Sequence, residues 1–395
     1  MKTDSKFNLV IMGVSCLDGM ASSMRVRNLI EPLLKDNLIN VNNLIHKKDY
    51  SDLSNCQNEG KINEIYFRII SFNLRNLFSL ISYIFKGIRF INKSKSKTGK
   101  NILYNYQYPE IKNILFLVYA KIKGYYIIFD IVEDLTYFNP DNKFEKFRIW
   151  SSNLFVKFSP KLANAIITIS SDLYKKMNLI CNNKIPVYHI PISVNLSYFP
   201  DKKKQKFDHD IKIFYGGSFG EKDGIEFLFK AVERIISKFD NVKLILTGRA
   251  NKTDGLKLKI LLDEFKYKDK IIFYGFLDTT DYYELLNSCD IFCLTRINSK
   301  FANAGFPFKL GEFLATRKAV ICTMVGDVTQ YLSNDINSIL IPPESVEKLV
   351  ESISFLIENP DKIISLGMEG RKVSEKYFDS ELLSKNLLTI FNMIR

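Results

Sequence analysis

The chain has 395 residues, of which 46% are hydrophobic and 25% charged, and this composition excludes a largely disordered protein. Its length exceeds one ordinary core and indicates two domains of about 150–200 residues each. The net charge of +13 favours an anionic partner such as nucleic acid, an acidic membrane surface or a phosphorylated substrate, although the codon bias of an AT-rich genome would give the same excess of lysine.

The N-terminal stretch MKTDSKFNLVIMG lacks the long apolar core and cleavage site of a signal peptide. No apolar run approaches the roughly 18 residues that cross a bilayer. The six cysteines form no CxxC pair, and Cys289 and Cys293 have no histidine nearby to complete a zinc set. We therefore expect a reduced, cytoplasmic protein that is soluble or attached peripherally at the inner face of the cytoplasmic membrane.

Apolar strand-like runs alternate with segments of helical period along the whole chain. The runs are FNLVIM, NILYNY, YYIIFD and AIITIS in the first half, and IKIFYG, VKLILTG, KIIFYG, DIFCLT and AVICT in the second. Between them, Met20–Lys35, Gly224–Lys238 and Thr279–Ser288 carry apolar residues at three- and four-residue spacing. This alternation predicts an α/β fold of buried parallel strands with helices on both faces of each sheet.

Two long stretches of the first half are basic and apolar together. Residues 66–100 and 142–158 mix lysine and arginine with phenylalanine, isoleucine and leucine, and the second stretch holds the only tryptophan. Basic amphipathic helices of this kind are typical of proteins that lie on an anionic membrane. Ordinary helices that cover a sheet give the same pattern, so both interpretations stay open.

A polar, charged stretch, FPDKKKQKFDHD, interrupts the alternation and reads as a linker. The sequence therefore predicts a Rossmann-like domain over residues 1–200, a second over 201–378, and a last helix over 379–395 that packs back on the first domain. Open parallel sheets bind ligands beyond the carboxyl ends of their strands, so we expect a site in a cleft where two such domains face each other.

In each half, the first strand is followed by a loop with glycine and small residues. In GVSCLDGMASSMRVR, Gly19 lies at the turn and Arg25 in the first turns of the helix. In YGGSFGEKDG, Gly217 and Ser218 precede Lys222. The second loop is neither GxGxxG nor GxxxxGK[ST], but close backbone amides and an ammonium group suit a diphosphate. Ordinary glycine-lined turns are the alternative for both loops.

Two more strands of the second half end in arginine, at Arg249 and Arg296, which together with Lys222 favour a phosphate-binding rim. The stretch GFPFKLGEFLATRKAV then predicts a helix from Pro307 to about Thr316. Its Lys309 and Glu312 share one face, where the carboxylate would accept hydrogen bonds from a vicinal diol such as a ribose and the ammonium would hold a phosphate or sugar oxygen. The alternative is an intrahelical salt bridge, which adds only about 0.2–0.5 kcal/mol.

Taken together in chain order, these loops, strand ends and helices resemble those of a GT-B glycosyltransferase. They are most similar to glycosyltransferase family 4, whose members retain the configuration of the transferred sugar. YGGSFGEKDGIEFLFKAV is similar to the family's glycine-rich loop and helix, and FPFKLGEFLATRKAVICTMVGD to its Pro-x-Lys-x-x-Glu branch. The resemblance covers almost the whole chain. It implies two Rossmann-like domains, with the acceptor bound by the first and a nucleotide sugar of the UDP or GDP type bound by the second.

The resemblance also assigns roles to residues of this chain. Glu312 matches the second glutamate of the family's Glu-(seven residues)-Glu motif, which binds the ribose, and Lys309 matches the lysine of its branch. Lys222 lies one residue before the position of the family's diphosphate-binding lysine, which is Asp223 here. Ser218 replaces an arginine, and Arg249 or Arg296 would supply that charge.

Ala304 stands where the family has its first motif glutamate, which contacts the donor sugar, while Gly305 and Phe306 keep the loop whose amides would meet that sugar. In the first domain, the expected histidine is absent, and its best positional substitutes are Tyr106, Gln107 and Glu133. Gly19 and Arg25 are further candidates on the acceptor side.

The resemblance implies that Lys309, Glu312 and Arg296 support catalysis, with no cofactor and no required metal. The expected activity is retaining transfer of a sugar to a lipid-linked or oligosaccharide acceptor in cell-surface polysaccharide synthesis, with an anionic membrane surface as a further partner. Nucleic acid is not an expected partner because no recognition motif accompanies the charge. A catalytically inactive scaffold subunit and a nucleotide-sugar 2-epimerase remain as alternatives.

Overall fold

The structure is a computed structural model that describes residues 6–16, 20–44, 69–70, 77–108, 111–137, 143–200 and 210–395. The chain divides into two compact units, of which unit 1 comprises residues 1–191 and 380–395 and unit 2 comprises residues 192–379. The C-terminal segment thus belongs to the same unit as the first 191 residues. Most of the expected linker, residues 201–209, lies outside the described residues.

Unit 1 contains a seven-stranded sheet in the order β3-β2-β1-β4-β5-β6-β7, and its strand pairs are parallel. The strands are β1 (Phe7–Met12), β2 (Ile39–Leu44), β3 (Ile69–Ile70), β4 (Lys100–Tyr106), β5 (Tyr126–Ile131), β6 (Ala165–Thr168) and β7 (Val187–His189). The four apolar runs expected in this half form β1, β4, β5 and β6. Such continuous apolar runs are what a strand covered on both faces requires.

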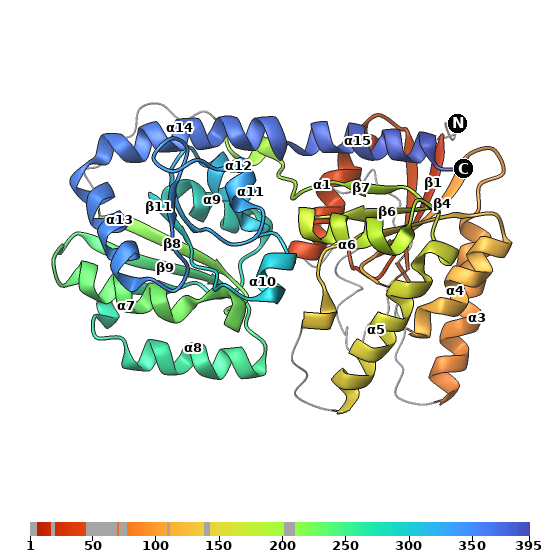
Figure 1. The fold of residues 1–395 in the computed structure, drawn as a ribbon, viewed down its shortest axis with the longest axis horizontal. Coiled ribbons are helices and arrows are strands. Elements are labelled where there is room, and N and C mark those ends of the chain that lie inside the picture. The colour runs from red at the N-terminus through yellow and green to blue at the C-terminus, as the bar shows by residue number, and fades with distance from the viewer. Residues whose placement is uncertain are drawn as a thin grey trace. The chain divides into compact units, whose positions relative to one another are not determined.

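Helices cover both faces of this sheet. Figure 1 shows α1 (Ala21–Lys35) and α15 (Ser380–Met393) on one side, and α3 (Leu77–Ser94), α4 (Ile111–Ile122) and α5 (Lys143–Leu162) side by side on the other. The helix α6 (Ser171–Cys181) packs against α5. Leu387 and Phe391 of α15 are fully buried, and the Phe391 ring lies 5.6 Å from that of Phe7 in β1. The last helix therefore completes the core of unit 1.

Unit 2 contains a six-stranded parallel sheet in the order β10-β9-β8-β11-β12-β13. The strands are β8 (Ile211–Gly217), β9 (Val242–Gly248), β10 (Ile271–Phe273), β11 (Ile291–Leu294), β12 (Ala319–Thr323) and β13 (Ile339–Ile341). The run KIIFYG forms β10, but it is only half-buried because β10 is an edge strand with one neighbour. The expectation that all these runs are buried is wrong for this strand.

The helices of unit 2 connect these strands and extend beyond them. They are α7 (Ile225–Ile236), α8 (Lys252–Glu264), α9 (Thr279–Ser288), α10 (Lys300–Ala304), α11 (Lys309–Ala315), α12 (Val328–Tyr331), α13 (Val346–Glu358) and α14 (Pro360–Tyr377). In α7, buried residues recur at three- and four-residue spacing, which gives one apolar face toward the sheet. This regular pattern explains why α7 lies within its predicted segment, and α9 has the bounds that the sequence predicted.

The strand order reverses at one strand of each sheet. In unit 1, β1 lies between β2 and β4, and in unit 2, β8 lies between β9 and β11. The connection that follows β1 therefore runs to one side of the sheet and the connection that follows β4 to the other, and the same holds for β8 and β11. Loops that follow such strands diverge and leave room for a ligand at the carboxyl edge of the sheet.

Candidate active site

The loop after β8 depends on glycine for its close approach to neighbouring strands. Gly217 ends β8 and pairs with Gly248, which ends β9. Gly248 has a φ of +140°, and a Cβ there would lie 1.9 Å from the carbonyl oxygen of Gly217. Gly224 has a φ of +60°, and a Cβ there would lie 2.2 Å from the carbonyl oxygen of Thr295. Only glycine allows these three loops to meet at the edge of the sheet.

Polar donors of this loop bind a carboxylate of the same loop. The Ser218 hydroxyl donates to Asp223 Oδ2 at 3.0 Å, and the Gly220 amide donates to the same oxygen at 3.2 Å. Burial raises the pKa of Tyr215 well above its usual range, and its hydrogen bond to Asp223 acts in the same direction. The sequence predicted that Gly217 and Ser218 would face a diphosphate, whereas in this structure Asp223 organises the loop around a negative charge.

Two of the predicted cations rest on aromatic rings. The Lys222 ammonium lies 4.7 Å from the centre of the Phe301 ring, and the Arg249 guanidinium lies 4.6 Å from that of Phe276. A cation–π contact orients the charged end of a side chain against the ring face. Both side chains are therefore positioned by aromatic neighbours.

The loop after β11 binds directly to the loop after β8. The Thr295 hydroxyl donates to the Asp223 carbonyl oxygen at 2.9 Å, and the Ile297 amide donates to the Lys222 carbonyl oxygen at 3.1 Å. Arg296 lies between these two contacts in sequence, and its Nη1 donates to the Ala302 carbonyl oxygen at 3.2 Å. The structure thus brings Lys222 and Arg296 to one rim, as their positions at strand ends predicted.

The helix that carries Lys309 and Glu312 is shorter than predicted. The sequence indicated Pro307 to about Thr316, whereas α11 runs from Lys309 to Ala315. Pro307 stays outside the helix, and its carbonyl oxygen accepts from the Leu310 amide at 3.0 Å. The helix ends before Arg317, whose φ of +61° is left-handed and incompatible with continuing it.

Glu312 is the most buried carboxylate of this rim, with 2% of its surface exposed. Its Oε2 accepts from the Tyr282 hydroxyl at 2.8 Å, and its Oε1 accepts from the Tyr283 hydroxyl at 3.1 Å. Tyr283 is itself fixed, because its ring stacks on that of Tyr198 at 4.1 Å. The carboxylate is therefore held in one orientation by two hydroxyl groups.

Tyr282 also links this carboxylate to Lys309. The Lys309 ammonium donates to the Tyr282 hydroxyl at 2.8 Å and lies 4.4 Å from the centre of its ring. Burial lowers the pKa of Lys309, and the negative charges of Glu312 and Asp223 oppose that shift. The tyrosine hydroxyl stands between the two charges, so the simple intrahelical salt bridge is not formed.

The loop before α11 offers backbone groups only. Ala304 and Gly305 are buried, and no carboxylate occupies the position of Ala304. The Phe306 ring packs 5.5 Å from Tyr331 and 5.8 Å from Phe378, which makes it part of the core. Any contact of Gly305 or Phe306 with a ligand must therefore involve their main chain.

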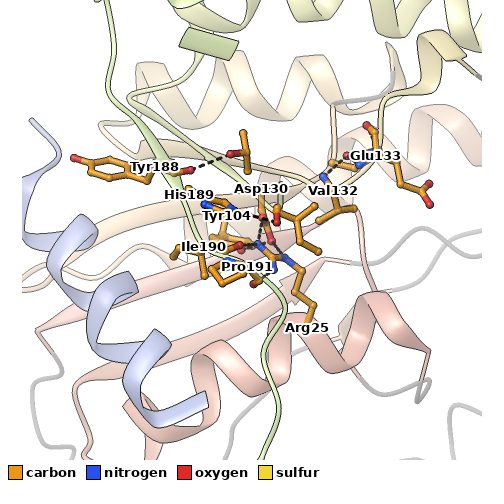
Figure 2. Close-up of polar contacts among 12 residues, drawn as sticks. Arg25, Tyr104, Asp130, Val132, Glu133, Tyr188, His189, Ile190 and Pro191 are labelled. Atoms are coloured by element: carbon orange, nitrogen blue, oxygen red, sulfur yellow. Dashed lines mark hydrogen bonds and ion pairs between the residues drawn. The ribbon is translucent and has the colours of Figure 1, made fainter. Parts of the chain in front are cut away.

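In unit 1, Arg25 is an interior residue (Figure 2). Its side chain is 1% exposed and forms a two-point ion pair with Asp130, with Nε–Oδ2 and Nη2–Oδ1 distances of 2.8 Å each. It also donates to the carbonyl oxygens of Ile190 and Pro191, at 3.0 and 2.6 Å. Tyr104 donates to the same carboxylate at 2.6 Å. The guanidinium is thus engaged on all sides, which assigns Arg25 to structure in place of the acceptor contact that the sequence suggested.

The other acceptor-side residues have different surroundings. Gln107 has a φ of +66°, and its side-chain amide donates to the Glu133 carbonyl oxygen at 2.9 Å and accepts from the Val132 amide at 3.0 Å. It therefore joins the ends of β4 and β5. Glu133 itself is half-buried at this edge, and Gly19 lies outside the described residues.

Sequence reasoning did not identify the aromatic and acidic partners of these residues. Tyr282 and Tyr283 follow β10 on α9, and Asp130 lies within β5, far in sequence from the groups that they bind. The only local signal was the pair of adjacent tyrosines in TTDYYELL. Within the described part of the chain, no group of three or more His, Cys, Asp or Glu side chains is arranged to hold a metal ion.

Parts of the chain are similar in sequence to known proteins. Residues 199–373, nearly all of which lie in unit 2, match the family described as Glycosyl transferases group 1. The chain is 23% identical over 258 residues to the capsular polysaccharide biosynthesis glycosyltransferase CapM of Staphylococcus aureus. This alignment covers 62% of this chain and 66% of CapM. The chain thus has homologues among glycosyltransferases, and the alignment spans just under two thirds of this relative.

Solved structures extend the likeness to both units. HepE from Anabaena, in complex with UDP, matches with a TM-score of 0.71 and 13% identity, covering 98% of this chain and 99% of HepE. Sucrose-phosphate synthase from Thermosynechococcus elongatus matches with a TM-score of 0.76 and 16% identity, covering 97% and 98%. At these identities the likeness shows the fold alone, which is the two-domain α/β fold of the GT-B glycosyltransferases.

The Arg25–Asp130 pair makes a stability prediction. Replacing Arg25 by Ala leaves a buried carboxylate without its partner, which costs about 3–5 kcal/mol of unfolding free energy. Urea unfolding followed by the fluorescence of Trp150, the only tryptophan and a residue of unit 1, measures this loss. Arg27→Ala is the matched control, because Arg27 pairs with Glu31 one turn along the same helix and should lose only about 0.3–0.5 kcal/mol. Equal losses in both variants would contradict the structural role of Arg25.

Proposed function

We propose that the chain is a glycosyltransferase that moves a sugar from a nucleotide-sugar donor of the UDP or GDP type to a lipid-linked saccharide acceptor in cell-surface polysaccharide synthesis. The donor would bind at the carboxyl edge of the unit 2 sheet. The group 1 domain at residues 199–373 and the homology to CapM support this proposal. The UDP bound to HepE, a protein of the same fold, favours a nucleoside diphosphate as part of the donor.

The observation that carries the proposal is the environment of Glu312. Its buried carboxylate already accepts one hydroxyl hydrogen bond on each oxygen. A carboxylate offers about four acceptor positions, so this one retains capacity for two more hydroxyl groups. A ribose presents two adjacent hydroxyl groups, and a fixed carboxylate suits them because their hydrogen bonds are charge-assisted.

The cations of the same rim suit the diphosphate of such a donor. Lys309 is linked to Glu312 through Tyr282, and Arg296 and Lys222 lie on the loops that bind each other after β11 and β8. When the glycosidic bond breaks, negative charge develops on the leaving diphosphate, and positive groups already in position stabilise that charge. Transfer then needs no metal ion to neutralise the leaving group.

The proposal includes retention of the anomeric configuration of the transferred sugar. In the family that the sequence resembles, the leaving phosphate takes the proton of the acceptor hydroxyl. No strong side-chain base is then demanded of unit 1, which is consistent with the polar but fully engaged side chain of Gln107 at the end of β4. The anomeric configuration of the product, read by nuclear magnetic resonance, tests this part directly, and an inverted product would refute it.

A catalytically inactive scaffold is the second candidate, and two observations favour it. Ala304 provides no carboxylate for the donor sugar, and Asp223 places a negative charge where a phosphate-binding lysine was expected. A thermal-shift screen with UDP, GDP, CMP and their sugars, followed by assays of donor hydrolysis and transfer, separates the two functions. Donor binding with turnover supports the enzyme, whereas no turnover with any donor that binds supports the scaffold.

The Glu312 assignment predicts a specific loss of ribose recognition. Wild-type protein should bind UDP about 10–100-fold more tightly than 2′-deoxy-UDP, because hydrogen bonds to a charged group contribute about 1.5–3 kcal/mol. Glu312→Gln should bind both nucleotides with similar, weakened affinity in isothermal titration calorimetry. Glu284→Gln, on an exposed position of α9, is the control and should keep the wild-type difference. If Glu312→Gln still discriminates fully between the two nucleotides, Glu312 does not bind the ribose.

The lowered pKa of Lys309 predicts how binding depends on pH. The ammonium form attracts the diphosphate, so UDP affinity should fall as pH rises through the pKa of Lys309, which lies below the ordinary lysine value of 10.5. In Lys309→Arg the guanidinium stays charged over the whole range, so the fall due to this residue should disappear. Titrations between pH 7 and 10 on both proteins measure the difference, and ionisation of the uracil base affects both alike. Identical profiles would exclude Lys309 as the diphosphate cation.

A further inference from the structure

Unit 1 presents an outer surface built from three neighbouring helices, α3, α4 and α5, which cover the face of the sheet opposite α1 and α15 (Figure 1). Gly87 of α3 allows close contact with α4, since a Cβ there would lie 2.5 Å from the Phe116 ring. The Lys121 ammonium of α4 donates to the carbonyl oxygens of Lys161 and Leu162 at the end of α5, at 2.5 and 3.1 Å. The three helices therefore form one continuous layer, which we call the outer helical face.

The middle helix of this face has exposed apolar residues on one side. Leu115, Val118 and Ile122 of α4 are 53%, 41% and 76% exposed, and their spacing of three and four residues puts them on a single stripe. On α3, Ile81 and Phe85 form a similar pair one turn apart, with Phe85 70% exposed. Isolated exposed apolar residues are ordinary on soluble proteins, but aligned stripes on adjacent helices mark an interaction surface.

The helix α5 repeats this stripe with aromatic residues. Phe147, Trp150, Leu154 and Phe158 are exposed at helical spacing, and the rings of Phe147 and Trp150 stack 5.8 Å apart. The opposite side of α5, which includes Phe155 and Val156, is buried against the rest of unit 1. The exposed stripe is thus a second apolar side of the helix, separate from the one that packs in the core.

The charge of these helices is almost entirely positive. Over their whole lengths α3, α4 and α5 carry ten lysine and arginine residues and a single acidic residue, Glu145. Their net charge of +9 is thus the larger part of the +13 of the whole chain. On α5, the exposed Lys146, Lys157 and Lys161 lie close to the aromatic stripe around the helix. Such long side chains place an ammonium group at the level of lipid headgroups while their stems lie along apolar surface.

We propose that the outer helical face binds the surface of an anionic lipid bilayer, with its aromatic and aliphatic stripes inserted at the headgroup boundary. The pairing of large exposed apolar side chains with lysines and almost no acidic residues matches an interfacial helix surface. An acidic protein partner would be matched by the charge but would leave wide apolar stripes to cover. None of the helices in the described part of the chain is long and apolar enough to cross a membrane.

This inference rests on unit 1 alone and is independent of the donor chemistry proposed for unit 2. The bilayer contact would also assist the proposed transfer reaction, because a protein that lies on a bilayer encounters a lipid-linked acceptor within the plane of the membrane. The face was predicted in part from the basic stretches 66–100 and 142–158. The stripe on α4 was not predicted, and it is what joins the other two into one surface.

Trp150 provides a direct test because it is the only tryptophan of the chain and lies on this face. Addition of vesicles of phosphatidylcholine and phosphatidylglycerol should shift its emission to shorter wavelength and carry the protein into the pellet on sedimentation. Vesicles of phosphatidylcholine alone should bind at least about tenfold more weakly, and salt should weaken the anionic binding by screening the lysines. No shift and no sedimentation with the anionic vesicles would overturn the proposal.

Paired variants identify the face responsible. Phe85→Ser with Ile122→Ser should reduce vesicle binding about tenfold or more, while Leu256→Ser with Ile260→Ser, at exposed positions of α8 in unit 2, should leave it unchanged. Thermal shift by UDP should be the same in both variants, which separates failure of this inference from failure of the donor site. Equal vesicle binding by both variants would refute the assignment to this face. A shift of Trp150 emission that depends on protein concentration without vesicles would show that a second copy of the chain covers it instead.

Discussion

The reversal of strand order around β8 is the constraint on which the candidate site depends. Because β8 has β9 on one side and β11 on the other, the loops that follow these strands start together at one edge of the sheet and diverge. Gly217, Gly224 and Gly248 make this convergence sterically possible, since a Cβ on Gly224 or Gly248 would overlap a neighbouring carbonyl oxygen. Lys222, Arg249 and Arg296 then reach the same rim although long segments of sequence separate them. In unit 1, the direct pairing of β4 with β5 brings Gln107 to the end of β5.

Both units contain an arrangement of opposite charges linked to a tyrosine hydroxyl, but the two arrangements differ in their exposure. Arg25 and Asp130 are fully buried and form an ion pair, and Tyr104 donates a further hydrogen bond to Asp130. Their charges therefore neutralise each other inside unit 1. In unit 2, Tyr282 stands between Lys309 and Glu312, and Lys309 is only half-buried. A half-buried ammonium beside a buried carboxylate remains able to meet a ligand, whereas an enclosed ion pair is a structural element. This difference in burial distinguishes the candidate site from a core element made of the same residue types.

The distribution of charge also differs between the units. In unit 1 most of the excess charge lies on α3, α4 and α5, whose connections all run on one face of the sheet. Right-handed crossovers between consecutive parallel strands place successive helices on the same side, which gathers three apolar stripes and their lysines into a single surface. In unit 2 the cations of interest lie at strand ends instead. The positive residues of the chain therefore lie on two separate surfaces, the rim at the strand ends of unit 2 and the outer helical face of unit 1.

Much of the fold followed from local sequence, and much of the site did not. The runs FNLVIM and VKLILTG are continuous enough to identify β1 and β9, and Lys309 and Glu312 could be selected because the glycine- and proline-containing stretch around them sets them apart. Three strands could not be identified from the sequence. The strand β2 has the sequence INVNNL, whose asparagines interrupt the apolar pattern, and β7 and β13 have only three residues each. The sequence by itself determined the α/β alternation, the two sheets and the residues that carry charge, because these depend on periodicity and composition. Only the tertiary structure decided that Arg25 is buried in an ion pair with Asp130, 105 residues away. It also decided that the Tyr282 hydroxyl accepts from Lys309, 27 residues away. Burial and the choice of partner depend on which distant segments the strand order brings together.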